Sequence, residues 1–180
     1  IHAPCPNLSS WSGCVLPSVH YDSIMVAVDG ACRGNGRPDA TAACAIFFSQ
    51  DSPYNETHVL SGDEFTPVTS QRAELMGGIK ALEAAKRLVD YSEEAGYTSL
   101  NQVVIKTDSA YLMGGATVWI HKWKSRGWTN AKGAPVVNQD LFRLLEDRIE
   151  TLEHAGVLVQ FFHVPRHRNR EADAAARRAL

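Results

Sequence analysis

The sequence predicts one α/β domain built on a five-stranded mixed sheet flanked by helices. Two observations favour this class. In the first part of the chain, short apolar stretches follow one another through turns, as in an antiparallel meander of three strands. In the second part, strand-like stretches alternate with helical periodicity, which favours parallel strands connected by helices. The length of 180 residues and the hydrophobic content of 44% suit a single globular domain.

Three apolar stretches of strand length predict the meander. The first ends in Asp29-Gly30, and the glycines at 34 and 36 mark a turn before the second. The predicted strands span 24–28, 42–49 and 58–65.

A long amphipathic helix follows the meander. Its apolar residues recur at helical spacing, and Thr69 or Ser70 provides its N-terminal cap. Gly77 and Gly78 lie inside this helix, where each costs about 1 kcal/mol relative to alanine. We therefore expect close packing against the sheet at this point.

The second part of the chain continues with two strands and three helices. The strand at 102–107 is again followed by an aspartate, Asp108, and a short helix is expected at 109–114. Asn138 is expected to cap a second amphipathic helix. The last strand and an Ala-rich final helix span 157–164 and 171–180.

Residues 1–23 are predicted to be a loosely structured tail in front of a domain at 24–180, because they are rich in Pro, Ser, Gly and Asn. Their cysteine and histidine residues could be a zinc site, although the spacing matches no common zinc finger, and a Cys5–Cys14 bridge is an alternative. The residues of that possible zinc site are His2, Cys5, Cys14 and His20.

No membrane association is expected. No apolar stretch approaches the roughly 18 residues of a spanning helix, and the first residues lack the pattern of a secretory signal. We therefore expect an intracellular protein, cytoplasmic or nuclear, with a mitochondrial location left open.

The formal charge of −2 argues at first against a nucleic-acid partner, because phosphates are bound by cations. The charge is unevenly distributed, however. Residues 1–100 carry 6 basic and 12 acidic side chains, whereas residues 101–180 carry 12 basic and 8 acidic ones. The net charge therefore excludes no partner.

Carboxylates gather at positions that predict a metal site. If the strands before Asp29 and Asp108 are parallel neighbours, their ends lie about 4.8 Å apart at a sheet edge where ligands bind. Glu74 and Asp173 add acids near the starts of two helices. Four converging acids would favour hard cations such as Mg²⁺ or Mn²⁺. The alternatives are Asx turns for the aspartates at strand ends, and interactions with helix dipoles for the other two acids.

Five motifs, in order, resemble those of type 1 ribonuclease H over roughly residues 24–180. Any one of them is weak, but together they are highly specific. They are Val28-Asp29-Gly30 with Gly34-Asn35-Gly36; residues 69–75, with the sequence TSQRAEL; residues 107–111, with the sequence TDSAY; residues 118–128, with the sequence VWIHKWKSRGW; and residues 163–167, with the sequence HVPRH, followed by residues 169–173, with the sequence NREAD.

The resemblance implies hydrolysis of the RNA strand of RNA–DNA hybrids, without sequence specificity, by two Mg²⁺ ions for which Mn²⁺ can substitute. It implies that the metal-binding catalytic carboxylates are Asp29, Glu74, Asp108 and Asp173. It also implies that the backbone of Gly30 joins the metal site and that His167 assists product release or proton transfer. The loop after His167 is shorter than is usual in the family.

The resemblance further implies contacts to both strands of the hybrid. Three residues are similar to those that read the minor groove, where the 2′-hydroxyl distinguishes RNA from DNA: Asn35, Ser70 and Gln71. A basic protrusion, or handle, is expected to hold the DNA strand. Its contact residues are Trp119, Lys122, Trp123, Lys124 and Arg126. Thr69 and Asn138 resemble a DNA-phosphate pocket, and Tyr111 is also expected to contact the hybrid.

Three alternatives remain open from the sequence. The tryptophans of the handle could be core residues, with the lysines forming a solvated face. The chain could also be a hybrid- or RNA-binding module with weakened activity, or the ribonuclease H domain of a larger replicative or retroelement polyprotein. We expect a monomer that needs no protein partner.

Overall fold

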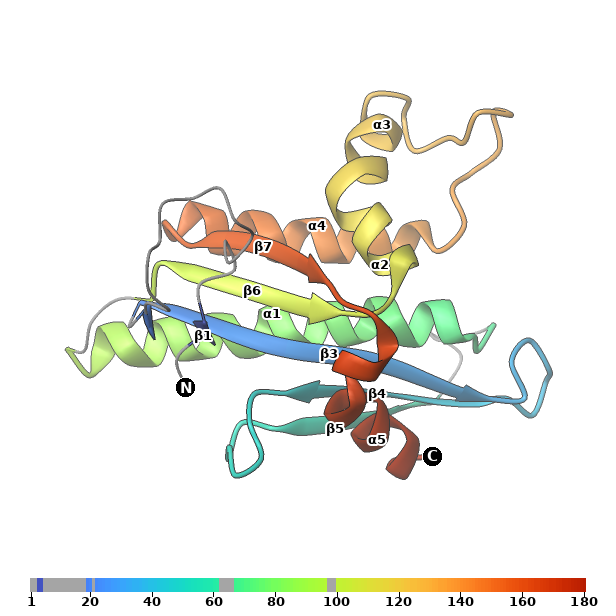
Figure 1. The fold of residues 1–180 in the computed structure, drawn as a ribbon. Helices are drawn as coiled ribbons and strands as arrows, with labels where there is room; N and C mark the ends of the chain where they lie inside the picture. Colours follow the sequence, from blue (N-terminus) through green and yellow to red (C-terminus); the bar gives the residue numbers. More distant parts are fainter. Residues whose placement is uncertain (1–2, 5–18, 21, 62–66, 97–99) are drawn as a thin grey trace.

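The predicted α/β class is confirmed by the computed structural model, which describes residues 3–4, 19–20, 22–61, 67–96 and 100–180. A five-stranded sheet with the strand order β5-β4-β3-β6-β7 forms the centre of the molecule (Figure 1). Strand β4 pairs antiparallel with both β3 and β5, and β6 and β7 run parallel to β3. The strands are β3 (Ser23–Arg33), β4 (Thr41–Phe47), β5 (Glu56–Leu60), β6 (Gln102–Thr107) and β7 (Leu158–His163).

Two of these strands differ from the prediction. Strand β3 continues past Asp29 to Arg33, because β4 pairs with it over this whole stretch. Strand β5 begins at Glu56 and ends at Leu60, whereas the sequence predicted 58–65; residues 62–66 lie outside the described residues.

The helices agree with the predicted order, and three short elements are added to them: a π-helical turn, the helix α3 and a 3₁₀ turn. A π-helical turn at Gly115–Trp119 continues α2 into α3, and a 3₁₀ turn at Arg166–Arg168 precedes α5. The helices are α1 (Ser70–Glu94), α2 (Ala110–Gly114), α3 (Ile120–Lys124), α4 (Gln139–His154) and α5 (Arg170–Arg178).

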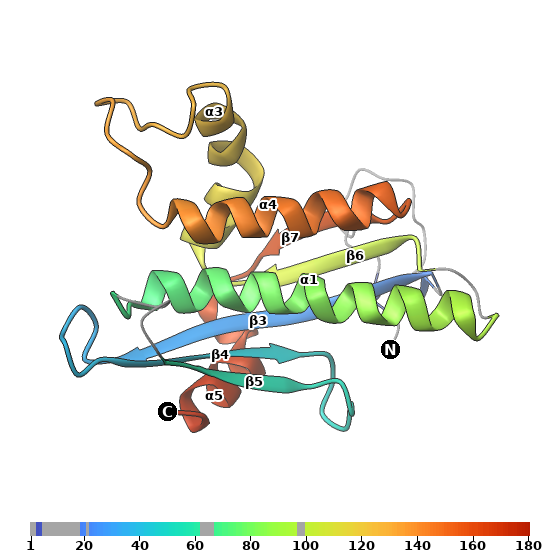
Figure 2. The ribbon, with the colours of Figure 1, turned by 180° about the vertical axis from the view of Figure 1, so that it is seen from behind.

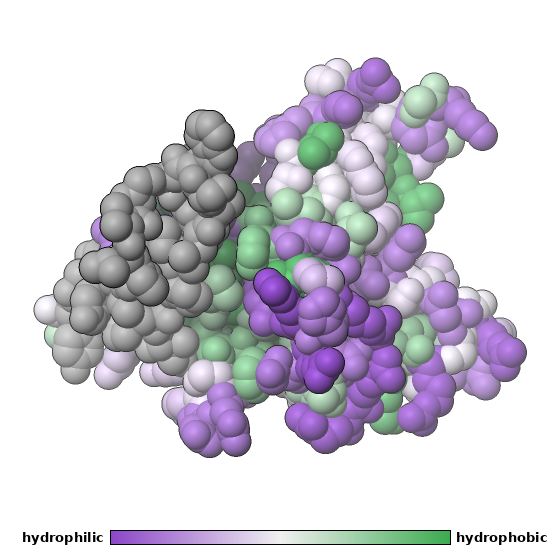
Figure 3. All heavy atoms as spheres, in the orientation of Figure 1, coloured by the Kyte–Doolittle hydropathy of each residue, from purple (hydrophilic) through white to green (hydrophobic). Residues whose placement is uncertain are grey.

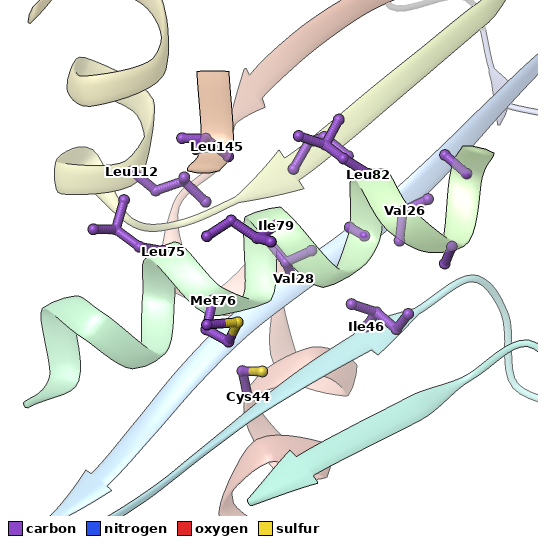
Figure 4. Packing of buried hydrophobic residues seen from close by; sticks show 14 of the residues in the cluster. Val26, Val28, Cys44, Ile46, Leu75, Met76, Ile79, Leu82, Leu112 and Leu145 are labelled. Atoms are coloured by element: carbon purple, nitrogen blue, oxygen red, sulfur yellow. The ribbon is translucent and has the colours of Figure 1, made fainter. Parts of the chain in front are cut away.

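The core lies between the sheet and two of these helices. Figure 2 shows α1 and α4 on one face of the sheet, and α5 lies on the other. On the α1 face, the apolar side chains of β3 and β6 meet those of the helices (Figure 4). The fully buried residues there include Val26, Val28, Ile79, Leu82 and Leu145. Burial of this surface is the main force that holds α1 on the sheet.

Glycines allow α1 to lie unusually close to β3. A Cβ atom on Gly30 would lie 2.3 Å from the Glu74 backbone nitrogen, and one on Gly77 would lie 3.3 Å from the Asp29 carbonyl oxygen. The expected close packing on the sheet is therefore confirmed for Gly77. Gly78 instead faces two helices, since its Cβ would lie 2.9 Å from a methyl group of Leu112.

The caps of the two long helices differ from each other. Thr69 caps α1, because its hydroxyl accepts a hydrogen bond from the Arg72 N–H at 3.2 Å. Asn138 occupies the cap position of α4 but makes no side-chain cap bond there. The expected capping by Asn138 is therefore wrong. Its backbone is left-handed, with φ of 57°, and its amide is bonded to Tyr111 instead.

The N-terminal tail is described only in part. Two short strands, β1 (Ala3–Pro4) and β2 (Val19–His20), form an antiparallel pair. The suggested zinc site and the Cys5–Cys14 bridge rest on residues and side chains outside the described part of the chain. Of the helices that the structure describes, none combines the length and apolar character needed to cross a bilayer.

Substituting Gly30 with alanine tests the close approach of α1 to β3. We expect Gly30→Ala to lower the free energy of unfolding by about 3 kcal/mol, because the added methyl group meets backbone atoms that cannot move aside. Urea denaturation measures the change. Gly96→Ala is the comparison, because that position has open space but a φ of 69°, so only backbone strain of about 1 kcal/mol applies. Equal losses in the two variants would contradict the close approach.

Candidate active site

Two aspartates leave the sheet where strand β3 changes its neighbours. Strands β3 and β6 are parallel neighbours, as predicted, and pair as far as Val28 and Thr107. The residue that follows each of these partners is an aspartate, Asp29 or Asp108. Beyond this point β3 pairs with β4 alone. The opening at this topological switch is where open α/β sheets bind ligands.

Helix α1 adds the third acid, Glu74, beside these aspartates. The Ser109 hydroxyl donates a hydrogen bond to Glu74 Oε2 at 2.5 Å. The same hydroxyl accepts from the Leu112 N–H at 3.0 Å, so it also caps α2. Ser109 therefore fixes the position of Glu74 relative to the segment that carries Asp108.

Asn169 holds Asp108 in place, a role that was not predicted from the sequence. Its side chain is fully buried, and its amide nitrogen donates to Asp108 Oδ1 at 2.7 Å and to the Val28 carbonyl oxygen at 2.9 Å. Its Oδ1 is buried and has no hydrogen-bond partner among the described residues. The only signal in the sequence was its place in the motif that leads to Asp173.

The fourth acid, Asp173, projects from α5 and is paired with two arginines. Arg166 donates to Asp173 Oδ1 at 2.8 Å, and Arg177 donates to the same oxygen at 3.1 Å. Both arginine side chains remain largely exposed, at 68% and 59%. In this structure, Asp173 therefore has cationic partners, whereas Asp108 and Glu74 are held by neutral donors.

The environments of Asp29, Glu74 and Asp173 shift the pKa values of these acids in different directions. Burial, followed by the charge of Asp108, raises the pKa of Asp29 to about 7, despite a hydrogen bond from the Gly30 N–H. Burial also raises the pKa of Glu74, although the Ser109 hydrogen bond opposes it. Burial pushes the pKa of Asp173 up, but the arginines outweigh it, so this pKa is lowered. The site thus holds more negative charge than it can stabilise without a further cation.

The four acids line one hollow of about 770 Å³. Other residues expected to act on the substrate line it too: Gly30, Ser70, Gln71 and Tyr111. The remaining predicted contact residues lie outside its lining: Asn35, Thr69, Trp119, Lys122, Trp123, Lys124, Arg126, Asn138 and His167.

Two pairs of the predicted contact residues are hydrogen-bonded to each other. Asn35 Oδ1 accepts from the Ser70 N–H at 3.0 Å, which fixes the turn after β3 against the start of α1. The Asn138 amide donates to the Tyr111 hydroxyl at 3.0 Å. The structure therefore brings these residues together from segments far apart in the sequence.

The handle begins at the π-helical turn and ends at α4. Its two tryptophans lie in a row of aromatic rings, with Trp119 next to Tyr111 and Trp123 next to Phe142 at centroid distances of 5.8 and 4.9 Å. Trp119 and Trp123 also contact each other at 5.8 Å. Both rings are partly exposed, so they connect the handle to the core and still present a surface.

One expected cation of the handle is already paired. Lys124 Nζ lies 2.8 Å from a carboxylate oxygen of Glu146 and 2.9 Å from one of Glu150, both on α4. Hydrogen bonds to these two carboxylates raise the pKa of Lys124. Its charge is therefore less available to a phosphate than the sequence suggested. Lys122, Arg126 and Lys132 are exposed and form no ion pair with another described residue.

The 3₁₀ turn before α5 places Arg166, rather than His167, against the acids. His167 is exposed and does not line the hollow, whereas Arg166 does. The role expected for His167 stays a prediction.

The donor set of the hollow fits a hard divalent cation. All four acids supply oxygen, and burial with mutual repulsion raises the pKa of two of them, which an added cation would relieve. Within the described part of the chain, no three His, Cys, Asp or Glu side chains lie close enough to form a ready ligand set. Asp108 and Asp173 are at present bonded to Asn169 and Arg166.

The opposite pKa shifts predict opposite effects on stability in the absence of metal. The raised pKa of Asp29 gives stability that is present below its unfolded value and is lost as the pH rises through about 7. Asp29→Asn should therefore raise the free energy of unfolding at pH 8 by about 2 to 4 kcal/mol. Asp173 has a lowered pKa, so its ionised carboxylate stabilises the folded protein at pH 8. Asp173→Asn should therefore lower the free energy of unfolding at that pH.

Urea denaturation at pH 8 and pH 5 with a chelator measures both changes. At pH 5 the benefit of Asp29→Asn should shrink, because the folded wild-type protein then holds the proton on Asp29. A lower free energy of unfolding for Asp29→Asn at pH 8 would contradict the raised pKa of Asp29.

Comparisons with known proteins agree with this geometry. A sequence model of the RNase H family matches residues 21–180. A Ribonuclease H from Parvibaculum lavamentivorans is 36% identical over 159 residues, which cover 88% of this chain and 93% of the bacterial protein. Human Ribonuclease H1 is 33% identical over 160 residues. The chain spans about half the length of that protein, at 49%, with 87% of the chain covered.

Solved structures share the fold. The crystal structure of LC9-RNase H1 has a TM-score of 0.58 at 25% identity, covering 87% of this chain and 72% of that one. LC11-RNase H1, solved in complex with an RNA/DNA hybrid, has a TM-score of 0.54 at 18% identity, covering 86% and 94%. The match of the family model to most of the chain, together with the bacterial relative, shows that this chain belongs to the RNase H family.

Proposed function

We propose that this chain is an endonuclease that hydrolyses the RNA strand of RNA–DNA hybrids with the help of Mg²⁺. The observation that carries the proposal is the convergence of four acids from β3, α1, α5 and the segment after β6 in one polar hollow. These acids are Asp29, Glu74, Asp108 and Asp173. The curated relatives named above are themselves ribonucleases H, which supports the same activity.

The chain's own residues would prepare the site for the cations. Among the described residues, no ion pair involves the carboxylate of Asp29 or Glu74, so these two acids are suited to bind metal. Ser109 and Asn169 orient Glu74 and Asp108. Bound divalent ions supply an activated water and stabilise the leaving oxygen of the phosphodiester. Arg166 and Arg177 reduce the repulsion around Asp173.

The strands of the hybrid would be distinguished beside the hollow. Ser70 and Gln71 line it at the start of α1, and Asn35 is bonded to the Ser70 N–H. These polar groups are suited to contacts with a 2′-hydroxyl in the minor groove. The handle, with Lys122 and Arg126 exposed, would hold the phosphates of the DNA strand.

The alternative of a binding module with weakened activity has less support. Such a module would gain nothing from four buried or half-buried acids kept beside one another, because their repulsion is costly without a cation. Arg166, which directly precedes His167, places a cation beside Asp173.

The proposal predicts that Asp29→Asn removes cleavage of a labelled RNA–DNA hybrid in Mg²⁺. The substitution keeps the shape of the side chain but removes a charged oxygen ligand, so we expect the rate to fall at least about 1000-fold, by comparison with the loss of other central electrostatic groups. Circular dichroism should show an unchanged fold. The matched control, Asp51→Asn in the exposed turn between β4 and β5, should cleave at the wild-type rate.

The substrate class is tested on the wild-type protein with the hybrid, double-stranded RNA and double-stranded DNA. We expect cuts only in the RNA strand of the hybrid, and none with a chelator. Full activity of Asp29→Asn, or cleavage of double-stranded DNA, would overturn the proposal.

A further inference from the structure

The handle is not the most basic surface of this molecule, because a second cluster of cations lies at α5. The segment 166–178 carries five arginines and only two acids, Glu171 and Asp173. In the handle, by contrast, Lys124 is paired with two acids of α4. The strongest cluster of arginines in the described part of the chain therefore lies at α5 and not on the handle.

The arginines of this segment all lie on the surface, because α5 is anchored by small residues. Ala172 and Ala176 are fully buried against β3 and β4, which turns the arginines outward. Figure 3 shows hydrophilic side chains gathered over α5 and the preceding turn. We call this region the α5 surface, and its arginines are Arg166, Arg168, Arg170, Arg177 and Arg178.

Three of these arginines have no assigned task. Arg166 and Arg177 line the hollow and hold Asp173. Arg168, Arg170 and Arg178 are exposed, and none forms an ion pair with another residue that the structure describes. Exposed cations that repel one another bring no stability, so their concentration on the segment that also carries Arg166 and Arg177 favours an anionic partner.

The position of the α5 surface relative to the hollow indicates which partner. The hollow is lined by Ala110 and Tyr111 of α2, which continues into the handle, and also by Arg166 and Arg177 of the α5 surface. Figures 1 and 2 show α3 and α5 at opposite ends of the molecule. A strand whose phosphate lies at the four acids would therefore leave the hollow over α5, away from the handle.

We propose that the α5 surface binds the phosphates of the RNA strand where that strand leaves the hollow, so that the enzyme holds the cut strand at α5 and the DNA strand at the handle. This inference rests on the proposed function, because it takes the strand in the hollow to be RNA. It extends the substrate contacts to Arg168, Arg170 and Arg178, which lie beyond the hollow.

The test measures binding of a short blunt RNA–DNA hybrid, and of the same hybrid with a single-stranded extension of either its RNA or its DNA strand. A chelator prevents cleavage, and affinity is measured from 50 to 200 mM salt. The variant carries Arg168→Gln, Arg170→Gln and Arg178→Gln. The matched control carries Lys80→Gln, Lys86→Gln and Arg87→Gln, which remove the same charge from α1 and lie outside the lining of the hollow.

We expect the RNA extension to strengthen binding by the wild-type protein and the control, but not by the α5 variant. Three phosphate contacts to a single strand correspond to a slope of about 2 in log affinity against log salt. On the RNA-extended hybrid, the α5 variant should lose that slope. The ratio of wild-type affinity to variant affinity should then fall about 20-fold as the salt rises from 50 to 200 mM.

Three results would overturn the inference. Equal slopes and equal effects of the RNA extension in variant and wild type would remove the α5 surface as a binding site. If the α5 variant lost only the effect of the DNA extension, the α5 surface would bind the DNA strand and not the RNA strand. In both cases, cleavage of the hybrid by the wild-type protein in Mg²⁺ would leave the proposed function standing. A wild-type protein that neither binds nor cuts the hybrid would overturn both.

Discussion

Helix α1 lies so close to strand β3 that only the hydrogen of Gly30 fits between them. This approach brings the backbone of Glu74 directly beside the residue that follows Asp29. A larger side chain at position 30 would push the helix away from the strand and the third acid away from the aspartates. The apolar contacts of Val28, Ile79 and Leu82 hold the helix at that distance, so the core and the hollow lined by the four acids depend on the same packing.

The cost of bringing the four acids together explains much of what surrounds them. Each acid except Asp29 has a specific side-chain donor: a hydroxyl for Glu74, an amide for Asp108 and two guanidinium groups for Asp173. Among the described residues, Asp29 has no such side-chain donor, and its burial, followed by the charge of Asp108, raises its pKa to about 7. The described part of the fold thus limits the repulsion among the other three acids by fixed hydrogen bonds and leaves Asp29 without a side-chain donor.

The distribution of charge is also a matter of folding rather than composition. The basic run in the handle was visible in the sequence. The pairing of Lys124 with Glu146 and Glu150 was not, because these acids lie on another helix, α4, beyond the handle loop. The capping expected of Asn138 was wrong for a similar reason, since its amide bonds to Tyr111 across the fold. Local patterns predict which residues are charged or polar, and distant partners decide what those groups bind.

The sequence by itself determined the class of fold, the strand order along the chain and the four acids, because periodicity and strand-end aspartates are local properties. Only the tertiary structure decided that β3 continues beyond Asp29, that Asn169 holds Asp108, and that Arg166 rather than His167 reaches the acids. These features depend on contacts between residues far apart in the chain or on the path of a short turn. Such contacts form only once the sheet and α1 have brought their segments together.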